Sequence, residues 1–176
     1  RTIAREKSFF GLGCVAHVSM ARPVCSRLGN LILRAAENAK IKSVDRGTYL
    51  AMEGPQFSSF AESELYRSWG CDVIGMTNMP EAKLAREAEI CYATVGMVTD
   101  YDCWHPDHEA VTVDQVIQIL TDNAHNARRL VKEVSPMIST DHTGLDCECK
   151  TALDFAVVTQ EEARDLSTVS NLNAVA

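Results

Sequence analysis

The feature that most constrains the fold is a continuous apolar segment, residues 90–98, that ends in Thr99-Asp100-Tyr101-Asp102. A short apolar run of this kind predicts a strand covered on both faces, as in the sheets of α/β proteins. Such sheets bind ligands outside the carboxyl ends of their strands. Because side chains alternate along a strand, Asp100 and Asp102 are expected on the same side. The pair is either a recognition site for a small polar molecule or two loop carboxylates that cap a helix or face solvent.

Strand-like and helix-like segments alternate along the rest of the chain. Further strands are expected at residues 14–20, 44–52 and 72–76, and helices follow Pro23, Ser59 and Pro80. Capping-box patterns at residues 59–62 and 112–115 predict two helix starts, the second opening a long helix with one apolar stripe. The alternation predicts an α/β fold in a single domain, a mixed twisted sheet flanked by helices. Residues 1–136 form its α/β part, and residues 137–176 add a loop and a modest C-terminal helix over 161–176.

Composition narrows the classes of partner. The chain has 176 residues and a formal net charge of −7, and it contains no basic run. We therefore expect neither nucleic acid nor an anionic membrane as a partner. No segment approaches the roughly 20 apolar residues of a membrane helix. The seven cysteines mostly lie in apolar runs, which favours reduced, buried thiols and a cytoplasmic location over a disulfide framework.

Three predicted strand exits carry side chains suited to a flat, polar ligand, in the segments 53–57, 75–77 and 99–102. Phe57 is expected to stack on a ring, and Met76 to pack on the ring or on a sugar. Thr77 lies at a helix start, where a hydroxyl and free N–H groups favour an anion. The alternatives are core packing for Phe57 and Met76 and a helix N-cap for Thr77.

Three motifs resemble the S-methyl-5′-thioadenosine phosphorylases, a trimeric branch of the purine nucleoside phosphorylase superfamily. They are Met52-Glu53-Gly54-Pro55-Gln56-Phe57-Ser58-Ser59, Gly75-Met76-Thr77-Asn78-Met79-Pro80-Glu81 and Thr99-Asp100-Tyr101-Asp102-Cys103-Trp104. The resemblance runs in order from Arg1 to about Pro136 and implies a nucleoside phosphorylase-like fold. It also implies a pentosyltransferase that converts methylthioadenosine and phosphate to adenine and 5-methylthioribose 1-phosphate, in purine and methionine salvage. Phosphate is then a co-substrate, and no cofactor or metal is implied.

The resemblance also implies roles for individual residues. Asp100 is the catalytic group, because a protonated carboxyl donates to N7 of the leaving purine and stabilises its negative charge. Holding that proton requires burial and the nearby Asp102 to favour the neutral acid. Thr77 would meet phosphate. The substrate-binding set is Phe57, Met76, Thr77, Asp100, Asp102, Val113 and Val116, with His17 reaching in from the adjacent subunit. Taken alone, His17 in an apolar strand is also consistent with a satisfied core histidine.

One part of the family pattern has no match in the chain. The phosphate site of the family uses a Gly-rich loop after its first strand, an Arg-His pair and a Thr-Ala turn, all upstream of the segment that matches Arg1. Gly11 and Gly13 do not follow a strand in the required way. Because most of the groups that hold phosphate are missing, we expect these 176 residues alone to lack phosphorolytic activity. Both ends of the sequence also look cut.

Three rival interpretations stay open. One is a sister enzyme acting on methylthioinosine or ordinary purine nucleosides, although Asp100 favours a 6-aminopurine. Another is an inactive fragment that binds an adenine nucleoside without turnover. The third is a metal-binding or redox module built on Cys103, His105, His108, Cys147 and Cys149. The Cys147-Glu148-Cys149 spacing is tight for zinc, and no second pair of ligands follows it.

Overall fold

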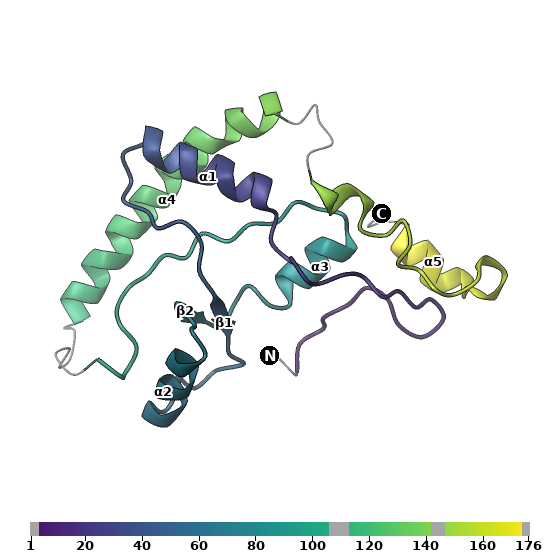
Figure 1. Ribbon diagram of the computed structural model, residues 1–176, viewed down its shortest axis with the longest axis horizontal. Helices are drawn as coiled ribbons and strands as arrows, with labels where there is room; N and C mark the ends of the chain where they lie inside the picture. The colour runs from purple at the N-terminus through teal and green to yellow at the C-terminus, as the bar shows by residue number, and fades with distance from the viewer. Residues whose placement is uncertain (1–3, 106–112, 142–146, 174–176) are drawn as a thin grey trace. The chain divides into compact units, whose positions relative to one another are not determined.

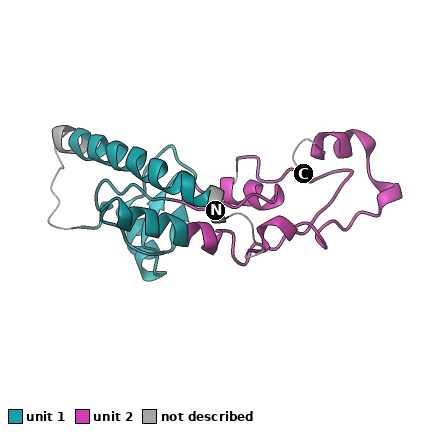
Figure 2. Cartoon of the chain, turned by 90° about the horizontal axis from the view of Figure 1, so that it is seen from above, with its two compact units in different colours: residues 1, 30–76, 95–143 teal, residues 2–29, 77–94, 144–176 magenta. Residues whose placement is uncertain are grey.

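The computed structural model describes residues 4–105, 113–141 and 147–173, with the side chains of 113–116 and 139–141 excepted. Figure 1 traces the elements, which mix helices with a short sheet. The chain groups into two compact units, shown in Figure 2. Unit 1 comprises residues 1, 30–76 and 95–143, and unit 2 comprises residues 2–29, 77–94 and 144–176. The predicted division at residue 136 stays a prediction.

The sheet of unit 1 is a parallel pair of strands joined by a helix. Strand β1 (Tyr49–Ala51) pairs with β2 (Val73–Gly75), with Ala51 opposite Gly75. Helix α2 (Phe60–Ser68) lies between them in sequence, so the three elements make a β-α-β unit. The backbone N–H of Met52 also donates to the carbonyl of Gly75 at 2.9 Å. The α/β interpretation of this region is confirmed, with ladders shorter than the predicted strands.

Helix α2 begins where its capping box predicts. The Ser59 hydroxyl accepts from the backbone N–H of Glu62, and the Glu62 carboxylate accepts from the N–H of Ser59. Two of the donors that a helix start leaves unpaired are thereby satisfied. The helix ends before Gly70, whose φ of +75° suits a residue without a Cβ. Local chemistry at both ends therefore fixes this helix between the two strands.

The core of unit 1 lies between two helices. The apolar face of α1 (Ser26–Asn38) contributes Leu31, Ala35 and Ala36, and α4 (Val113–Asp141) contributes Leu130 and Val134. The two helices lie side by side in Figure 1. In the described part of the predicted α4 stripe, Leu130 and Val134 are buried, whereas Ile117 and Leu120 are exposed.

Two predicted strands do not form ladders among the described residues. The segment 90–98 is extended without strand pairing, and Val95, Met97 and Val98 are exposed. The prediction of a strand covered on both faces is therefore wrong for this chain. Residues 14–20 make only an isolated bridge from Ala16 to Val157 and one from Cys14 to Gly11. The physical reason is that a strand needs a neighbouring edge along its length, and no described segment supplies one.

The C-terminal region differs from its prediction in detail. Helix α4 continues through Pro136 to Asp141, although a weaker pattern was expected after that proline. Met137 and Ile138 pack against the α1–α4 core, which holds the turn beyond Pro136 in place. The predicted helix over 161–176 is shorter: it consists of a 3-10 turn, η2 (Glu161–Ala163), and α5 (Leu166–Leu172). The remaining elements are α3 (Glu81–Glu87) and η1 (Glu148–Thr151).

A search of the described helices for a membrane span finds none with both the length and the apolar character that crossing a bilayer requires.

Candidate functional site

Two of the three predicted strand exits meet at one edge of the sheet in unit 1. Because β1 and β2 are parallel, residues 52–57 and Met76 leave from the same end. Gly54 has a φ of +70°, and a Cβ built on it would lie 2.6 Å from the Met76 sulfur. The Met76 thioether therefore occupies the space beside the Gly54 backbone, and the two exits are packed together.

The third exit is attached to the same region by Asp102. The buried Ser63 of α2 donates its hydroxyl to Asp102 Oδ2 at 2.7 Å, and the Cys103 backbone N–H donates to Oδ1 at 2.9 Å. The Cys103 thiol donates to the Ser58 carbonyl at 3.7 Å. Burial raises the pKa of Tyr66, and the nearby carboxylates of Glu62 and Asp102 raise it further. Asp102 is thus held against the N-terminal half of α2.

Asp100 lies in different surroundings from Asp102. Its side chain is exposed, and Asp100 Oδ2 accepts from the hydroxyl of the preceding Thr99 at 2.7 Å. The expectation that Asp100 is buried is therefore wrong for this structure, because residues 99–101 do not lie in a covered strand. Phe57 is also open, with 86% of its surface exposed, so its alternative assignment as a core residue is wrong.

A set of ring contacts beside the two aspartates was missed by sequence reasoning. Tyr101 lies edge-on to Trp104, with ring centroids 5.9 Å apart, and it also contacts His105 at 4.6 Å. The guanidinium of Arg67, on α2, lies 3.7 Å from the Trp104 ring centre. This cation–π contact gives the 101–105 segment a second attachment to α2. No spacing pattern marks Arg67 or Ser63, because both contacts join segments far apart in sequence.

The other predicted site residues lie elsewhere in the chain. Thr77 and His17 belong to unit 2, and both are exposed. The N-cap of α3 is Pro80, so the N-cap alternative for Thr77 is wrong. The backbone N–H of His17 donates to the Ala156 carbonyl at 2.8 Å, and its exposure rules out a core histidine. Val113 and Val116 lie at the start of α4, where their side chains are outside the described part.

One group of side chains in the described part has the composition of a metal site: Cys25, Cys91, Cys147 and Cys149, all in unit 2. Burial raises the pKa of the Cys149 thiol, as does the neighbouring Cys25. Burial acts in the same direction on Cys147, but the Cys149 backbone N–H, Cys91 and Arg27 together lower the pKa of Cys147 to about 7. The hydrogen bond to Cys91 is the main cause of the raised pKa of Arg27.

This group is not the metal or redox module considered from the sequence. Cys147 and Cys149 are common to both, but Cys103 and His105 belong to unit 1, and His108 lies outside the described residues. The partners of the Cys147–Cys149 pair are instead Cys25 and Cys91, which precede it in the chain. Among the described residues, Cys103 and His105 are therefore wrong members of the sequence-based set, and His108 stays untested.

Comparison with known protein families identifies the family of the chain. A family model described as the phosphorylase superfamily matches residues 2–136. The chain belongs to the phosphorylase superfamily. The match ends at Pro136, where the sequence resemblance was also expected to fade.

Two curated proteins that are similar to this chain share one name. Over its whole length, this chain is 57% identical to the S-methyl-5′-thioadenosine phosphorylase of Bradyrhizobium diazoefficiens and 55% identical to that of Cereibacter sphaeroides. It covers 60% and 61% of those two proteins. The chain therefore spans about three fifths of the length of the curated relatives that it matches.

Solved structures support the fold assignment. A methylthioadenosine phosphorylase from an antarctic soil metagenomic library matches with a TM-score of 0.91 and 47% identity, over 99% of this chain and 61% of the other. The Schistosoma mansoni methylthioadenosine phosphorylase in complex with adenine matches with a TM-score of 0.72 and 28% identity, over 99% and 62% of the two chains. The predicted nucleoside phosphorylase-like fold is confirmed.

Proposed function

We propose that this chain supplies the purine-recognising part of an enzyme that cleaves S-methyl-5′-thioadenosine with phosphate, yielding adenine and 5-methylthioribose 1-phosphate. The observation that carries the proposal is the pair Asp100 and Asp102: Asp102 is hydrogen-bonded to α2, and Asp100 is exposed. The names of the relatives support the substrate, since those at 57% and 55% identity are both S-methyl-5′-thioadenosine phosphorylases. Such an enzyme is a pentosyltransferase with phosphate as co-substrate.

The chemistry assigns different roles to the two aspartates. Asp102 has a donor on each of its oxygens, Ser63 on one and the Cys103 N–H on the other, so its carboxylate is oriented to accept from the purine amino group. Asp100 has one hydroxyl partner and an open face. When a purine covers that face and removes water, the neutral acid is favoured and can donate to N7. Charge that develops on the leaving purine is stabilised there.

The remaining substrate contacts follow from the same geometry. Phe57 presents a free ring next to the Ser58 carbonyl that binds Cys103, which suits stacking on a purine. Met76 is expected to contact the sugar, and Thr77 the phosphate. We assign Val113, Val116 and the His17 of an adjacent subunit to the methylthio group. The assembly is a homotrimer in the cytoplasm, and the reaction uses no cofactor.

Purine preference tests the aspartate assignment. Titration calorimetry of the chain with adenine and with hypoxanthine is expected to show adenine binding more tightly. In Asp100→Asn, the ratio of the hypoxanthine Kd to the adenine Kd is expected to fall by about tenfold, because an amide donates to a 6-oxo group. Asp45→Asn, an exposed carboxylate of the same unit, is the matched control and leaves the preference unchanged. A chain that prefers hypoxanthine is instead a 6-oxopurine phosphorylase.

Turnover is a separate test. The 176 residues contain no match to the Gly-rich loop, Arg-His pair or Thr-Ala turn of the family. We therefore expect them alone to bind adenine without releasing 5-methylthioribose 1-phosphate. The native protein purified from its own cells is expected to form that product from methylthioadenosine and phosphate. Its failure to do so contradicts the enzyme assignment and favours a nucleoside-binding protein. Turnover by the 176 residues contradicts only the expected inactivity.

A further inference from the structure

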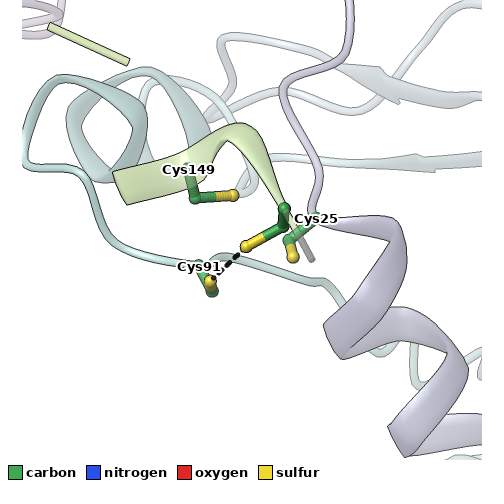
Figure 3. Close-up of side chains that lie close together, drawn as sticks. Cys25, Cys91 and Cys149 are labelled. Carbon is green, nitrogen blue, oxygen red and sulfur yellow. Dashed lines mark hydrogen bonds between the residues drawn. The ribbon is translucent and has the colours of Figure 1, made fainter. Parts of the chain in front are cut away.

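Four cysteines from three separate segments of unit 2 converge on one point. Cys25 precedes α1, Cys91 follows α3, and Cys147 and Cys149 belong to the turn that forms η1. Their four sulfur atoms all lie within 4.8 Å of one another. Figure 3 shows the side chains of Cys25, Cys91 and Cys149 lying close together, each from a different segment of the chain. The cluster takes no part in the purine site proposed above.

The spacing of the sulfurs is that of a tetrahedral metal site. Zinc–sulfur bonds of about 2.3 Å in a tetrahedron place the ligand sulfurs about 3.8 Å apart. The separation between the Cys91 and Cys147 sulfurs is 3.4 Å, and the largest in the group is no more than 4.8 Å. The two values bracket the tetrahedral distance, so small side-chain rotations bring all four sulfurs to it. Two of the four residues, Cys25 and Cys149, are buried.

The charged side chains around the cluster also favour a metal site. Arg27 donates to the Cys91 sulfur at 3.7 Å, and the buried Arg86 donates to the Cys149 sulfur at 3.6 Å. The Nε atoms of both arginines are buried with no hydrogen-bond partner among the described residues. Arg86 also pairs with the Glu148 carboxylate at 3.8 Å, on a side chain that is 89% exposed. Two guanidinium groups held in this way require negative charge in the cluster.

A bound divalent ion supplies that charge balance. Four thiolates around such an ion carry a net charge of about −2, which two guanidinium groups offset. Disulfides do not, because joining the sulfurs of Cys91 and Cys147 leaves uncharged sulfur in front of Arg27. Thiolate ligands select zinc over harder ions such as magnesium or calcium.

We propose that Cys25, Cys91, Cys147 and Cys149 bind one zinc ion as a structural tetrathiolate site. The ion fastens η1 to the start of α1 and to the segment that follows α3. The short Cys147–Cys149 spacing is then no obstacle, because the second pair of ligands comes from earlier in the chain. All four positions are taken by protein, so this site is closed to substrate.

Metal content and cobalt spectroscopy test the site on the full chain. The protein purified from zinc-supplemented cells is expected to carry one zinc per chain by mass spectrometry. After removal of zinc under reducing conditions, titration with Co²⁺ is expected to give the charge-transfer and d–d bands of a tetrathiolate, saturating at one equivalent. Binding also releases protons, because thiols lose them on coordination. Cys91→Ser and Cys149→Ser are expected to lose the tetrathiolate spectrum, whereas Cys103→Ser, outside the cluster, keeps it.

Arg27→Gln keeps all four ligands and separates a metal role from a folding defect. We expect its affinity for Co²⁺ to fall about tenfold, the effect typical of groups that support metal ligands. Arg46→Gln, an exposed arginine of unit 1, leaves the affinity unchanged. The proposal is overturned if reduced protein with four reactive cluster thiols takes up no Co²⁺. It is also overturned if unreduced peptides show disulfides among these cysteines and the protein holds no zinc.

Discussion

Ser63 and Asp102 are joined by a 2.7 Å hydrogen bond from a hydroxyl that is 2% exposed to a carboxylate 39 residues away. The hydroxyl lies on the inner face of α2, and the carboxylate follows an extended segment without regular structure. Together with the Cys103 backbone N–H, this serine therefore orients one of the two proposed purine-reading groups.

Removing that hydroxyl tests the relationship. Ser63→Ala is expected to lower the free energy of unfolding by about 1–3 kcal/mol, because a buried hydrogen bond to a charged group is lost. Adenine affinity is expected to fall with it, since Asp102 becomes free to turn. Urea unfolding and calorimetry measure the two effects. Ser68→Ala, on the exposed face of the same helix, should change neither by more than about 0.5 kcal/mol.

The approach of Met76 to Gly54 predicts opposite effects at two glycines. Gly54→Ala is expected to destabilise the protein by at least about 1–2 kcal/mol, because its φ is +70° and the new Cβ meets the thioether. Gly29→Ala, inside α1 with nothing within 4 Å of the new Cβ, should stabilise by about 0.5–1 kcal/mol. Denaturant midpoints compare the two variants. A Gly54→Ala variant that is stabilised, as Gly29→Ala is expected to be, would contradict the close packing of Met76 against Gly54.

Leucines on α4 provide a test of where the core lies. Leu130→Ala is expected to cost about 2–5 kcal/mol, because it opens a cavity between α1 and α4. Leu120→Ala, on the same helix but with 51% of its surface exposed, should cost about 0.5 kcal/mol or less. Thermal unfolding of the two variants measures the difference. A larger effect at Leu120 would place a buried face along the N-terminal half of α4.

Helix α5 is expected to contribute stability that depends on pH. Hydrogen bonds from Ser167 and Thr168 lower the pKa of Asp165, the N-cap of α5. A lowered folded pKa means that this contribution is present above the ordinary aspartate pKa and is lost as pH falls through the lowered value. The Tm difference between the protein and Asp165→Asn should therefore shrink as pH falls below the carboxyl range. A Tm difference that stays constant across this pH range would contradict the role of the Asp165 carboxylate at the N-cap.

The predictions that succeeded from sequence rest on local chemistry. The Ser59–Glu62 capping box and Gly70 fix both ends of α2, whatever the rest of the chain does. The periodic apolar positions of α1 place Leu31 and Ala35 in the core in the same way. The motifs at the strand exits led to the correct superfamily.

The predictions that failed depend on partners distant in sequence. Residues 90–98 have the composition of a buried strand, but a ladder also needs a neighbour that composition does not reveal. Exposure of Asp100 follows from that missing ladder. The cysteine cluster could not be found from spacing, because its ligands are separated by as many as 124 residues, from Cys25 to Cys149.

The interleaving of the two units limits the order in which the protein can be built. Unit 1 comprises residues 1, 30–76 and 95–143, and unit 2 joins residues 2–29 and 77–94 to residues 144–176. Residues 2–29 therefore pair with partners far along the chain, as in the hydrogen bond from the His17 N–H to the Ala156 carbonyl. Contacts of such long sequence separation slow folding and leave apolar surface uncovered in the meantime. Unit 2, and with it the cysteine cluster, therefore forms only once contacts of long sequence separation have been made.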